Sequence, residues 1–503
     1  MNYKNPIIPG FYPDPSICKA GDMYYIVCSS FQYFPGIPLF ESKDLVNWNQ
    51  IGCVLTRDSQ LPLANAVASE GIYAPTIRYY NGRFYVVTTN VSDMGNFYVW
   101  TDDIHGEWSD PIKVEQGGID PSLYFEAGKA YFMSNGADDE GNAGITQCEI
   151  DITTGKKLTP SKRIWTGTGG RFLESPHLYK INNEYYIMGA EGGTEYGHMV
   201  VYARGKTPYG PFENYHDNPV LTNRNLGGYM IQGCGHADLV QDNNGNWWMV
   251  HLAFRQMGKW TLYHTTGREV YLVPVTFHKD GWFTAGDNGT TRATIETDRL
   301  PKELVQKPCK SYDFSNITIG KELCFIRNPH MERYSFDGVS LKLIGSKTTI
   351  DSEKGSPTAL LIRQREMKGD ISCEVTVLEQ EAGITLYMDE KQHYDLGIRR
   401  TESGYDIIKR ICIGDIKYVQ QSVKINSEAD EMTVKLSIHA EETEYSFKAS
   451  CREEVYMLGA AQSKYLSTEV AGGFTGVMIG LYAQGDGVDS TLPAEFNNFK
   501  YHY

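Results

Sequence analysis

A hairpin pattern recurs five times in the first 300 residues and limits the folds that this chain can adopt. Each copy has a turn, a short alternating strand, a second turn rich in Gly, Asn or Lys, and a strand that starts with aromatic residues, which is typical of a β-hairpin. The copies start 46 to 61 residues apart and read DPSICKAGDMYY, APTIRYYNGRFY, DPSLYFEAGKAYF, SPHLYKINNEYY and HADLVQDNNGNWW. Repeats of this length indicate an architecture of successive similar units.

Further strand-like segments lie between the copies, among them IPLFESKDLVNWNQIG, NFYVWTDDIHGEWSDPIKV, ITQCEIDITTGKKL and HMVVYARGKTPYGPF. Each unit therefore supplies about four strands, which is the content of one propeller blade. Convincing amphipathic helices are absent from the sequence. We predict an all-β chain in which residues 1–300 form a five-bladed β-propeller.

The sequence pattern changes after the last repeat, where Pro301 and Pro308 mark a linker. From residue 310 onward, short alternating runs such as GVSLKLIG, DISCEVTVLE and MTVKLSIHAE are separated by turns rich in Gly, Asp and Asn. This pattern is typical of a β-sandwich. We therefore predict a second domain, a C-terminal β-sandwich, at residues 310–503.

The charge balance argues against nucleic acid and membranes as partners, because the formal net charge is −15 and no basic run interrupts it. The N-terminus MNYKNPIIPG lacks the apolar segment of a signal peptide, so we expect a cytoplasmic protein. The ten cysteines include no CxxC pair. This spacing favours reduced, mostly buried thiols.

Equivalent positions of the repeats should meet, because the innermost strand of every propeller blade starts at one mouth of the central channel. These positions are Asp14, Ala74, Asp120, Ser175 and His236, with Glu174 directly before Ser175. Carboxyl groups crowded in one pocket shift their pKa values apart, so that one holds a proton while another is ionised. Hydrolysis of a glycosidic bond needs such an acid and base. The alternative is that these acids only cap turns or lie on the surface.

Three acidic segments, NPIIPGFYPDPS, GGIDPSL and RFLESPHLYK, resemble the motifs of glycoside hydrolase family 43, and the resemblance covers nearly the whole chain. It implies a five-bladed propeller, inverting chemistry and no organic cofactor. By resemblance, Asp14 is the general base that activates water and Glu174 is the general acid that protonates the leaving oxygen. Asp120 orients Glu174 and raises its pKa by repulsion.

The resemblance also implies other site residues. His236, in GCGHADL, is the candidate ligand of a calcium ion on the channel axis, although a hydrogen-bonded channel histidine is an equal alternative. Arg268, in TTGREVYLVPV, is expected to hold sugar hydroxyls and keep nearby acids ionised. Phe31 and Tyr73 are expected to wall the sugar pocket, and Phe474, in GGFTG, is the candidate contact from a sandwich loop. Each of these three aromatic residues could instead belong to the packing.

A pocket closed on one side by a second domain favours hydrolysis at the end of a sugar chain over hydrolysis in its middle. The segments ESPH and GHAD and residue Tyr73 differ from the xylosidase-like pattern and favour arabinose. We predict an exo-glycosidase that releases terminal α-L-arabinofuranosyl units from arabinoxylan-derived oligosaccharides, with β-xylosidase side activity. The alternatives are a β-xylosidase acting on xylo-oligosaccharides, a retaining fructosidase, whose Arg-Asp-Pro and Glu-Cys motifs are missing here, and a non-catalytic sugar-binding propeller.

Overall fold

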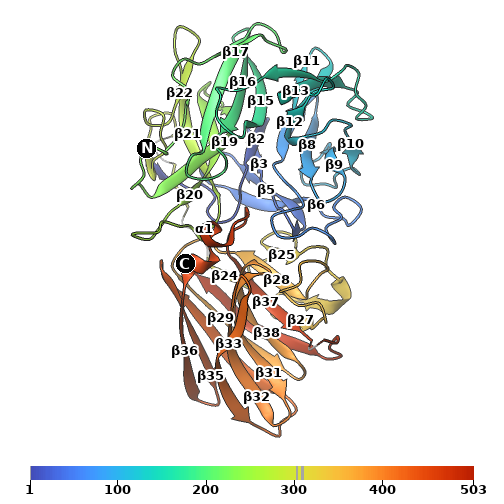
Figure 1. Cartoon of the computed structure of the whole chain (residues 1–503), viewed down its shortest axis with the longest axis vertical. Helices are drawn as coiled ribbons and strands as arrows, with labels where there is room; N and C mark the ends of the chain where they lie inside the picture. The colour runs from blue at the N-terminus through green and yellow to red at the C-terminus, as the bar shows by residue number, and fades with distance from the viewer. Residues whose placement is uncertain (1, 302–303, 308–310, 486) are drawn as a thin grey trace.

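The computed structural model describes residues 2–301, 304–307, 311–485 and 487–503, so Pro308, Cys309 and the predicted domain boundary at residue 310 lie outside the described residues. The described chain is built almost entirely of β-strands and has two domains, a propeller and a sandwich, stacked along its long axis (Figure 1). The prediction of an all-β propeller followed by a sandwich is confirmed.

Five four-stranded antiparallel sheets form the blades of the propeller, and each starts at one of the five hairpin repeats. In chain order, the first blade contains β2 (Ser16–Ala20), β3 (Met23–Val27), β5 (Gly36–Ser42) and β6 (Asn49–Leu55). The second contains β7 (Thr76–Tyr80), β8 (Arg83–Asn90), β9 (Gly95–Thr101) and β10 (Ile112–Lys113). The third contains β11 (Ile119–Glu126), β12 (Lys129–Ala137), β13 (Ala143–Ile150) and β14 (Lys162–Trp165).

The last two blades follow the same order, innermost strand first. The fourth contains β15 (Glu174–Ile181), β16 (Glu184–Glu191), β17 (Met199–Gly205) and β18 (Phe212–Asn214). The fifth contains β19 (Ile231–Gln241), β20 (Trp247–Arg255), β21 (Glu269–Phe277) and β22 (Phe283–Ala285). The short strands β1 (Asn2–Lys4) and β23 (Thr294–Glu296) pair with each other and join the two ends of the propeller segment.

Two antiparallel sheets pack into the sandwich, as expected for alternating strands with one apolar face. The first follows the order β26 (Tyr334–Phe336), β27 (Ser340–Ile344), β38 (Pro493–His502), β29 (Gly369–Val377), β34 (Met432–Ala440), β35 (Glu444–Cys451) and β36 (Glu454–Gln462), and β24 (Tyr312–Asp313) also pairs with β38. The second follows the order β33 (Ile416–Asn426), β32 (Gly404–Ile413), β31 (Gln392–Thr401), β30 (Glu381–Asp389), β37 (Met478–Gln484), β28 (Ala359–Arg363), β25 (Leu323–Ile326) and β4 (Tyr33–Phe34).

The last strand of that order, β4, belongs to the propeller segment, so the two domains share one sheet. Its Tyr33 and Phe34 pair with Ile326 and Phe325 of β25. The largest apolar core is also shared, since it contains side chains of the first two blades and of the sandwich. Sequence patterning did not predict this exchange, because β4 is only two residues long. The domains therefore form one packed unit.

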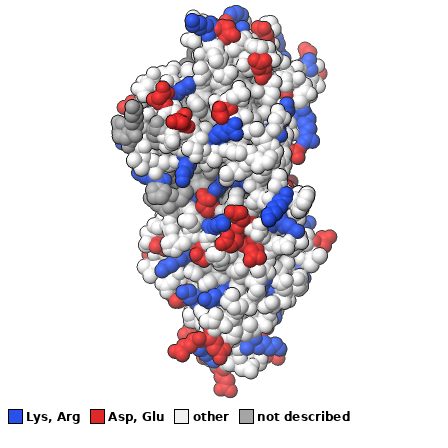
Figure 2. All heavy atoms as spheres, turned by 90° about the vertical axis from the view of Figure 1, so that its left-hand side faces the viewer, with Lys and Arg blue, Asp and Glu red and all other residues white. Residues whose placement is uncertain are grey.

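Helical structure is confined, in the described residues, to η1 (Met331–Arg333), η2 (Ser463–Leu466) and α1 (Thr468–Ala471), and no helix there could cross a membrane. Figure 1 shows α1 and its flanking segment between the two domains, with the segment reaching toward the propeller. Acidic and basic side chains are interspersed on the face drawn in Figure 2. The nine described cysteines are unpaired, and all but Cys53 are buried.

In four of the five blades, a residue in or just before the innermost strand has left-handed backbone geometry. The angle φ is 55° at Asp14, 52° at Asp120, 57° at Ser175 and 45° at His236. The pairing with the neighbouring strand shifts its register beside Asp120, Ser175 and His236. Residues with side chains rarely adopt this geometry, and a bulge of this kind turns a side chain away from the regular alternation of the strand. The repeat therefore turns side chains away from the regular alternation at the equivalent position of four of the five blades.

A buried ion pair joins the innermost strands of four blades. Asp238 Oδ2, on β19, lies 2.8 Å from Arg78 Nη1 on β7 and accepts a hydrogen bond of 2.6 Å from Ser16 Oγ on β2. The hydroxyl of Tyr179, on β15, donates to Asp238 Oδ1 at 2.5 Å. Arg78 Nη2 also lies 2.8 Å from Nδ1 of His177. Because buried charges require partners, this network fixes how the blades meet in the channel.

We predict that Asp238→Asn lowers the free energy of unfolding by about 3–5 kcal/mol, because it leaves the buried Arg78 guanidinium without its counter-charge. The measurement is denaturant unfolding followed by tryptophan fluorescence. The matched control is Asp102→Asn, which removes the partner of Arg83 on the surface and should have a much smaller effect. Equal stability of Asp238→Asn and the wild type would contradict the role given to this ion pair.

Candidate active site

A pocket of about 390 Å³ opens at the propeller mouth and is closed on one side by a loop of the sandwich. All the residues selected from the sequence line it: Asp14, Phe31, Tyr73, Asp120, Glu174, His236, Arg268 and Phe474. They come from all five blades and from the sandwich, so only the folded chain brings them together. Ala74, the second-blade residue equivalent to Asp14, also lines the pocket and adds no polar group there.

Asp14 is buried and held in its ionised form. Its Oδ1 lies 2.8 Å from Arg268 Nη1, and its Oδ2 accepts a hydrogen bond of 2.5 Å from Ser29 Oγ. Burial raises the pKa of Asp14, but Arg268, His236 and the Ser29 hydroxyl outweigh burial and hold this pKa below its usual value. A carboxylate with this environment can accept a proton from water.

Glu174 and Asp120 form a pair that binds protons more tightly than ordinary carboxylates. Burial, followed by the negative charge of Asp14, raises the pKa of Glu174 to about 7. Burial and the charges of Glu174 and Asp14 raise the pKa of Asp120 well above its usual value. Asp120 Oδ2 also accepts a hydrogen bond of 3.1 Å from the backbone N–H of Ser175, directly after Glu174. The site thus separates carboxyl groups into ionised and protonated forms at neutral pH.

His236 is a buried channel histidine between two of these acids. Its Nδ1 lies 3.7 Å from Asp14 Oδ1 and 3.8 Å from Asp120 Oδ2. Burial lowers the pKa of His236 below its usual value. Among the described residues, no group of three or more metal-ligand side chains includes His236, whereas Ca²⁺ prefers six to eight oxygen ligands. The protein groups at this position do not supply a calcium cage, and a calcium ion held mainly by water stays a prediction.

The aromatic wall of the pocket is shared by the two domains. The Phe31 ring lies 5.5 Å from the Tyr73 ring and 5.9 Å from the Phe474 ring, measured between centroids. The backbone N–H of Phe474 donates to Ser69 Oγ at 2.8 Å, and its carbonyl accepts from Arg268 Nη2 at 3.2 Å. The sandwich loop is therefore held against the propeller by polar contacts, and Arg268 contacts both Asp14 and this loop.

Close packing of two glycines brings that loop to the pocket. A side chain at Gly476 would place its Cβ 2.6 Å from the backbone nitrogen of Gly267, which is too close for any Cβ. The neighbouring N–H of Val477 donates to the carbonyl of Thr265 at 2.8 Å. The glycine in the sandwich segment GGFTGV thus permits backbone-to-backbone contact with the residues beside Arg268.

Sequence reasoning missed several pocket residues. His198, which follows the segment EYG, lines the pocket, and burial lowers its pKa to about 3. Thr194 accepts a hydrogen bond of 3.0 Å from Arg268 Nη1. Phe172 lies two residues before Glu174 in the segment RFLESPH. Proximity to Glu174 was a usable signal for Phe172, whereas no repeat position pointed to His198 or Thr194.

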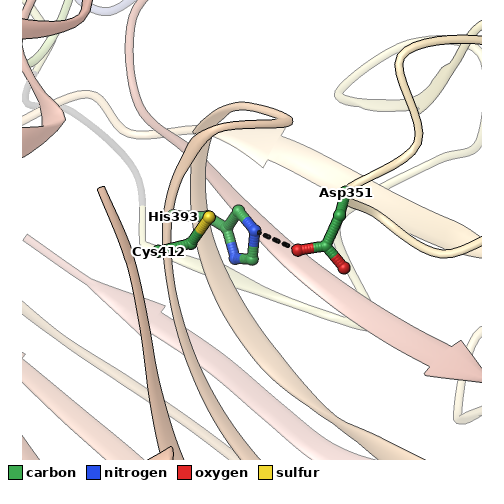
Figure 3. Close-up of side chains that lie close together, drawn as sticks. All are labelled: Asp351, His393 and Cys412. Atoms are coloured by element: carbon green, nitrogen blue, oxygen red, sulfur yellow. Dashed lines mark hydrogen bonds and ion pairs between the residues drawn. The ribbon is translucent and has the colours of Figure 1, made fainter. Parts of the chain in front are cut away.

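A second cluster of titratable side chains lies in the sandwich, where ligand-type atoms of Asp351, His393 and Cys412 are within 4.8 Å of one another (Figure 3). His393 Nε2 lies 3.1 Å from Asp351, and its Nδ1 lies 2.9 Å from Asp395. Lys417 also pairs with Asp351. Burial lowers the pKa of His393, but the two aspartates outweigh burial and raise this pKa well above its usual value. The cluster is satisfied by its own ion pairs and serves as a structural network.

Two protein families match the sequence, one over the propeller and one over the sandwich. Residues 3–283 match glycosyl hydrolases family 43, and residues 311–502 match the beta xylosidase C-terminal concanavalin A-like domain. The chain belongs to glycosyl hydrolase family 43. It is therefore a glycoside hydrolase, and the resemblance inferred from the three acidic motifs is confirmed. Family membership favours neither the fructosidase nor the non-catalytic alternative.

Relatives in family 43 match over almost their full length. The non-reducing end alpha-L-arabinofuranosidase BoGH43B of Bacteroides ovatus is 40% identical over 99% of this chain and 94% of the relative. A beta-xylosidase of Bacillus subtilis is 30% identical over 100% of this chain and 99% of the relative. A solved structure described as Bacteroides ovatus xyloglucan PUL GH43B has a TM-score of 0.92 and 39% identity, with 100% of both chains covered.

The pH dependence of hydrolysis should report the charges around the acids. We predict a bell-shaped profile of kcat/KM with an alkaline limb near pH 7, where Glu174 loses its proton, and an acid limb below the usual carboxylate range, where Asp14 gains one. In Arg268→Gln the acid limb should move to higher pH, because the positive charge that lowers the pKa of Asp14 is gone.

Arg268→Lys is the matched control, since it retains the charge and should leave the acid limb closer to its wild-type position. An unchanged acid limb in Arg268→Gln would show that another group sets the ionisation of Asp14.

Proposed function

We propose that this family 43 enzyme is an inverting exo-α-L-arabinofuranosidase that releases terminal arabinofuranosyl units from arabinoxylan-derived oligosaccharides, with β-xylosidase side activity. The observation that supports the reaction most strongly is the division of the pocket acids into an ionised Asp14 and a Glu174 whose pKa is raised to about 7. Hydrolysis with inversion needs an ionised base and a protonated acid that act in the same step.

In this mechanism Asp14 removes a proton from water as the water attacks the anomeric carbon. Glu174 donates its proton to the glycosidic oxygen, so that the sugar chain leaves as a neutral alcohol. Asp120 orients the start of β15 through the N–H of Ser175. The sequence prediction that Asp120 raises the pKa of Glu174 by repulsion is not supported, because burial and the charge of Asp14 raise that pKa and Asp120 itself is shifted toward its protonated form. Arg268 keeps Asp14 ionised and presents its guanidinium to the sugar. The mechanism uses no organic cofactor.

The choice of arabinose rests on the relatives and on the pocket wall. The 40% identical relative is named as an α-L-arabinofuranosidase, and a 36% identical relative from Butyrivibrio fibrisolvens is named as a xylosidase/arabinosidase. Tyr73, which departs from the xylosidase-like pattern, packs against Phe31 and Phe474 in the pocket wall. The Bacillus subtilis relative named as a beta-xylosidase supports xylose as the second candidate sugar.

Proton NMR of the first minutes of hydrolysis tests the sugar and the stereochemistry together. On a mixed arabinoxylo-oligosaccharide we expect β-L-arabinofuranose to appear first, because a single displacement inverts the α-configuration. Early α-xylose would reassign the principal activity to β-xylosidase. Early α-L-arabinofuranose would contradict inversion.

Substrates with different leaving groups distinguish the role of Glu174 as the acid from the role of Asp14 as the base. Glu174→Ala should lower kcat/KM on the oligosaccharide by about 10²–10⁴-fold but reduce hydrolysis of α-L-arabinofuranosyl fluoride far less, because fluoride leaves without protonation. Asp14→Ala should impair both substrates strongly, since water must be activated in either case. Equal losses on both substrates in Glu174→Ala would refute its role as the acid.

A calcium ion beside His236 can be tested separately by its effect on thermal stability. A bound ion would raise the unfolding temperature of EDTA-treated protein when calcium is returned, and His236→Gln would remove that rise. No change of the unfolding temperature with calcium in the wild type would contradict the ion.

A further inference from the structure

The pocket has an exposed aromatic side chain that the mechanism does not use. Phe172 lines the pocket and is 57% exposed, whereas Phe31 in the same wall is only 2% exposed. Single exposed apolar side chains are common on protein surfaces, and what distinguishes Phe172 from others such as Trp260 is that it lines the pocket. Phe172 is therefore placed at the open mouth of the pocket, where a ligand can cover it.

The chain position of Phe172 places it on the side of the acid. It lies two residues before Glu174, and its ring lies close to the position that a Cβ at Gly193 would occupy, at 3.0 Å. Phe474, by contrast, is held beside Arg268, which contacts the base Asp14. In an exo-glycosidase the terminal sugar fills the closed end of the pocket, and the leaving group lies toward the acid that protonates it.

The backbone that carries Phe172 is held rigidly. Glu191 is fully buried, and its carboxylate accepts hydrogen bonds from the N–H and hydroxyl of Thr168, at 2.6 and 2.5 Å, and from the N–H of Gly170 at 3.2 Å. A Cβ at Gly167 or Gly170 would lie within 2.5 Å of the Glu191 carboxylate, so this loop can fit around Glu191 only with glycine at both positions.

The following residues continue this support. The N–H of Gly192 donates to the carbonyl of Arg171 at 2.8 Å, and Arg171 Nε donates to the carbonyl of Gly192 at 3.1 Å. Phe172 itself has a φ of 54°, a geometry that bulky side chains rarely adopt and that persists where the surroundings impose it. A ring held in this way is pre-organised and loses little freedom when a ligand covers it.

Polar groups flank the ring, as in other sugar sites that combine an apolar platform with a few directed polar contacts. The Arg171 guanidinium lies 5.1 Å from the centre of the Phe172 ring and pairs with Glu195, which also lines the pocket. These groups can bond to the hydroxyls around a pyranose while the ring covers its apolar face.

We propose that Phe172 is the platform for the leaving sugar, a pyranose unit of the oligosaccharide next to the scissile bond, and that Glu191 is the positioning residue that holds the loop of this platform. This inference rests on the proposed glycosidase mechanism and extends it to the choice of leaving group. Phe172 contacts the substrate only on the leaving side, so its contribution depends on the size of the leaving group.

The test compares an arabinoxylo-oligosaccharide with α-L-arabinofuranosyl fluoride, whose leaving group is a single atom. In Phe172→Ala we expect the ratio of kcat/KM for the oligosaccharide to kcat/KM for the fluoride to fall at least tenfold, mainly through a higher KM for the oligosaccharide. Phe172→Trp should restore the ratio, because it again presents an aromatic face. Glu191→Gln should lower the ratio in the same direction, since an amide cannot accept all three hydrogen bonds.

Leu158→Ala is the matched control, because Leu158 is an exposed apolar residue outside the pocket lining. It should leave the ratio unchanged. An unchanged ratio in Phe172→Ala, or equal losses on both substrates, would overturn the platform while leaving the glycosidase mechanism intact. If the wild type hydrolyses the oligosaccharide and β-D-xylosyl fluoride but not the arabinosyl fluoride, the sugar assignment fails and the same ratio is measured with the xylosyl fluoride.

Discussion

The buried ion pair between Arg78 and Asp238 is the interaction on which the propeller and its pocket depend. Asp238 also holds Ser16 and Tyr179, so one carboxylate connects the innermost strands of the first, second, fourth and fifth blades. A central channel cannot be filled by side chains of a single blade, and a charged network there requires these four blades to be in register. His236 lies only two residues from Asp238, so the same strand that anchors the channel also contributes to the pocket.

A repeated backbone feature then places the acids above that network. Left-handed geometry at Asp14, Asp120, Ser175 and His236 occurs at the equivalent repeat position of four blades, and the strand pairing shifts its register beside the last three of these residues. Such geometry costs about 1–2 kcal/mol per residue and is retained where function requires it. The repulsion between these neighbouring carboxyl groups is relieved because they do not all carry a charge. Arg268 and Ser29 stabilise the charge on Asp14, while Glu174 remains protonated.

The sandwich contributes to the chemistry because it cannot separate from the propeller. Strand β4 leaves the first blade to complete a sandwich sheet, and the apolar core continues from one domain into the other. This shared sheet fixes the position of the loop that carries Phe474 over the pocket, where Gly267 and Gly476 meet. Both domains therefore line the pocket, with Phe474 contributed by the sandwich and Phe172 by the propeller.

The sequence by itself determined the number of blades, the sandwich and the three acids, because each repeat carries a local hairpin signal and the acids occupy its first position. It also placed Arg268, Phe31, Tyr73 and Phe474 at the pocket through the family resemblance. Only the tertiary structure decided that β4 crosses into the sandwich, that His198 and Thr194 join the site, and which carboxyl group is ionised. These features depend on contacts between residues far apart in the chain, such as Asp14 with Arg268, and local sequence patterns carry no record of such distances.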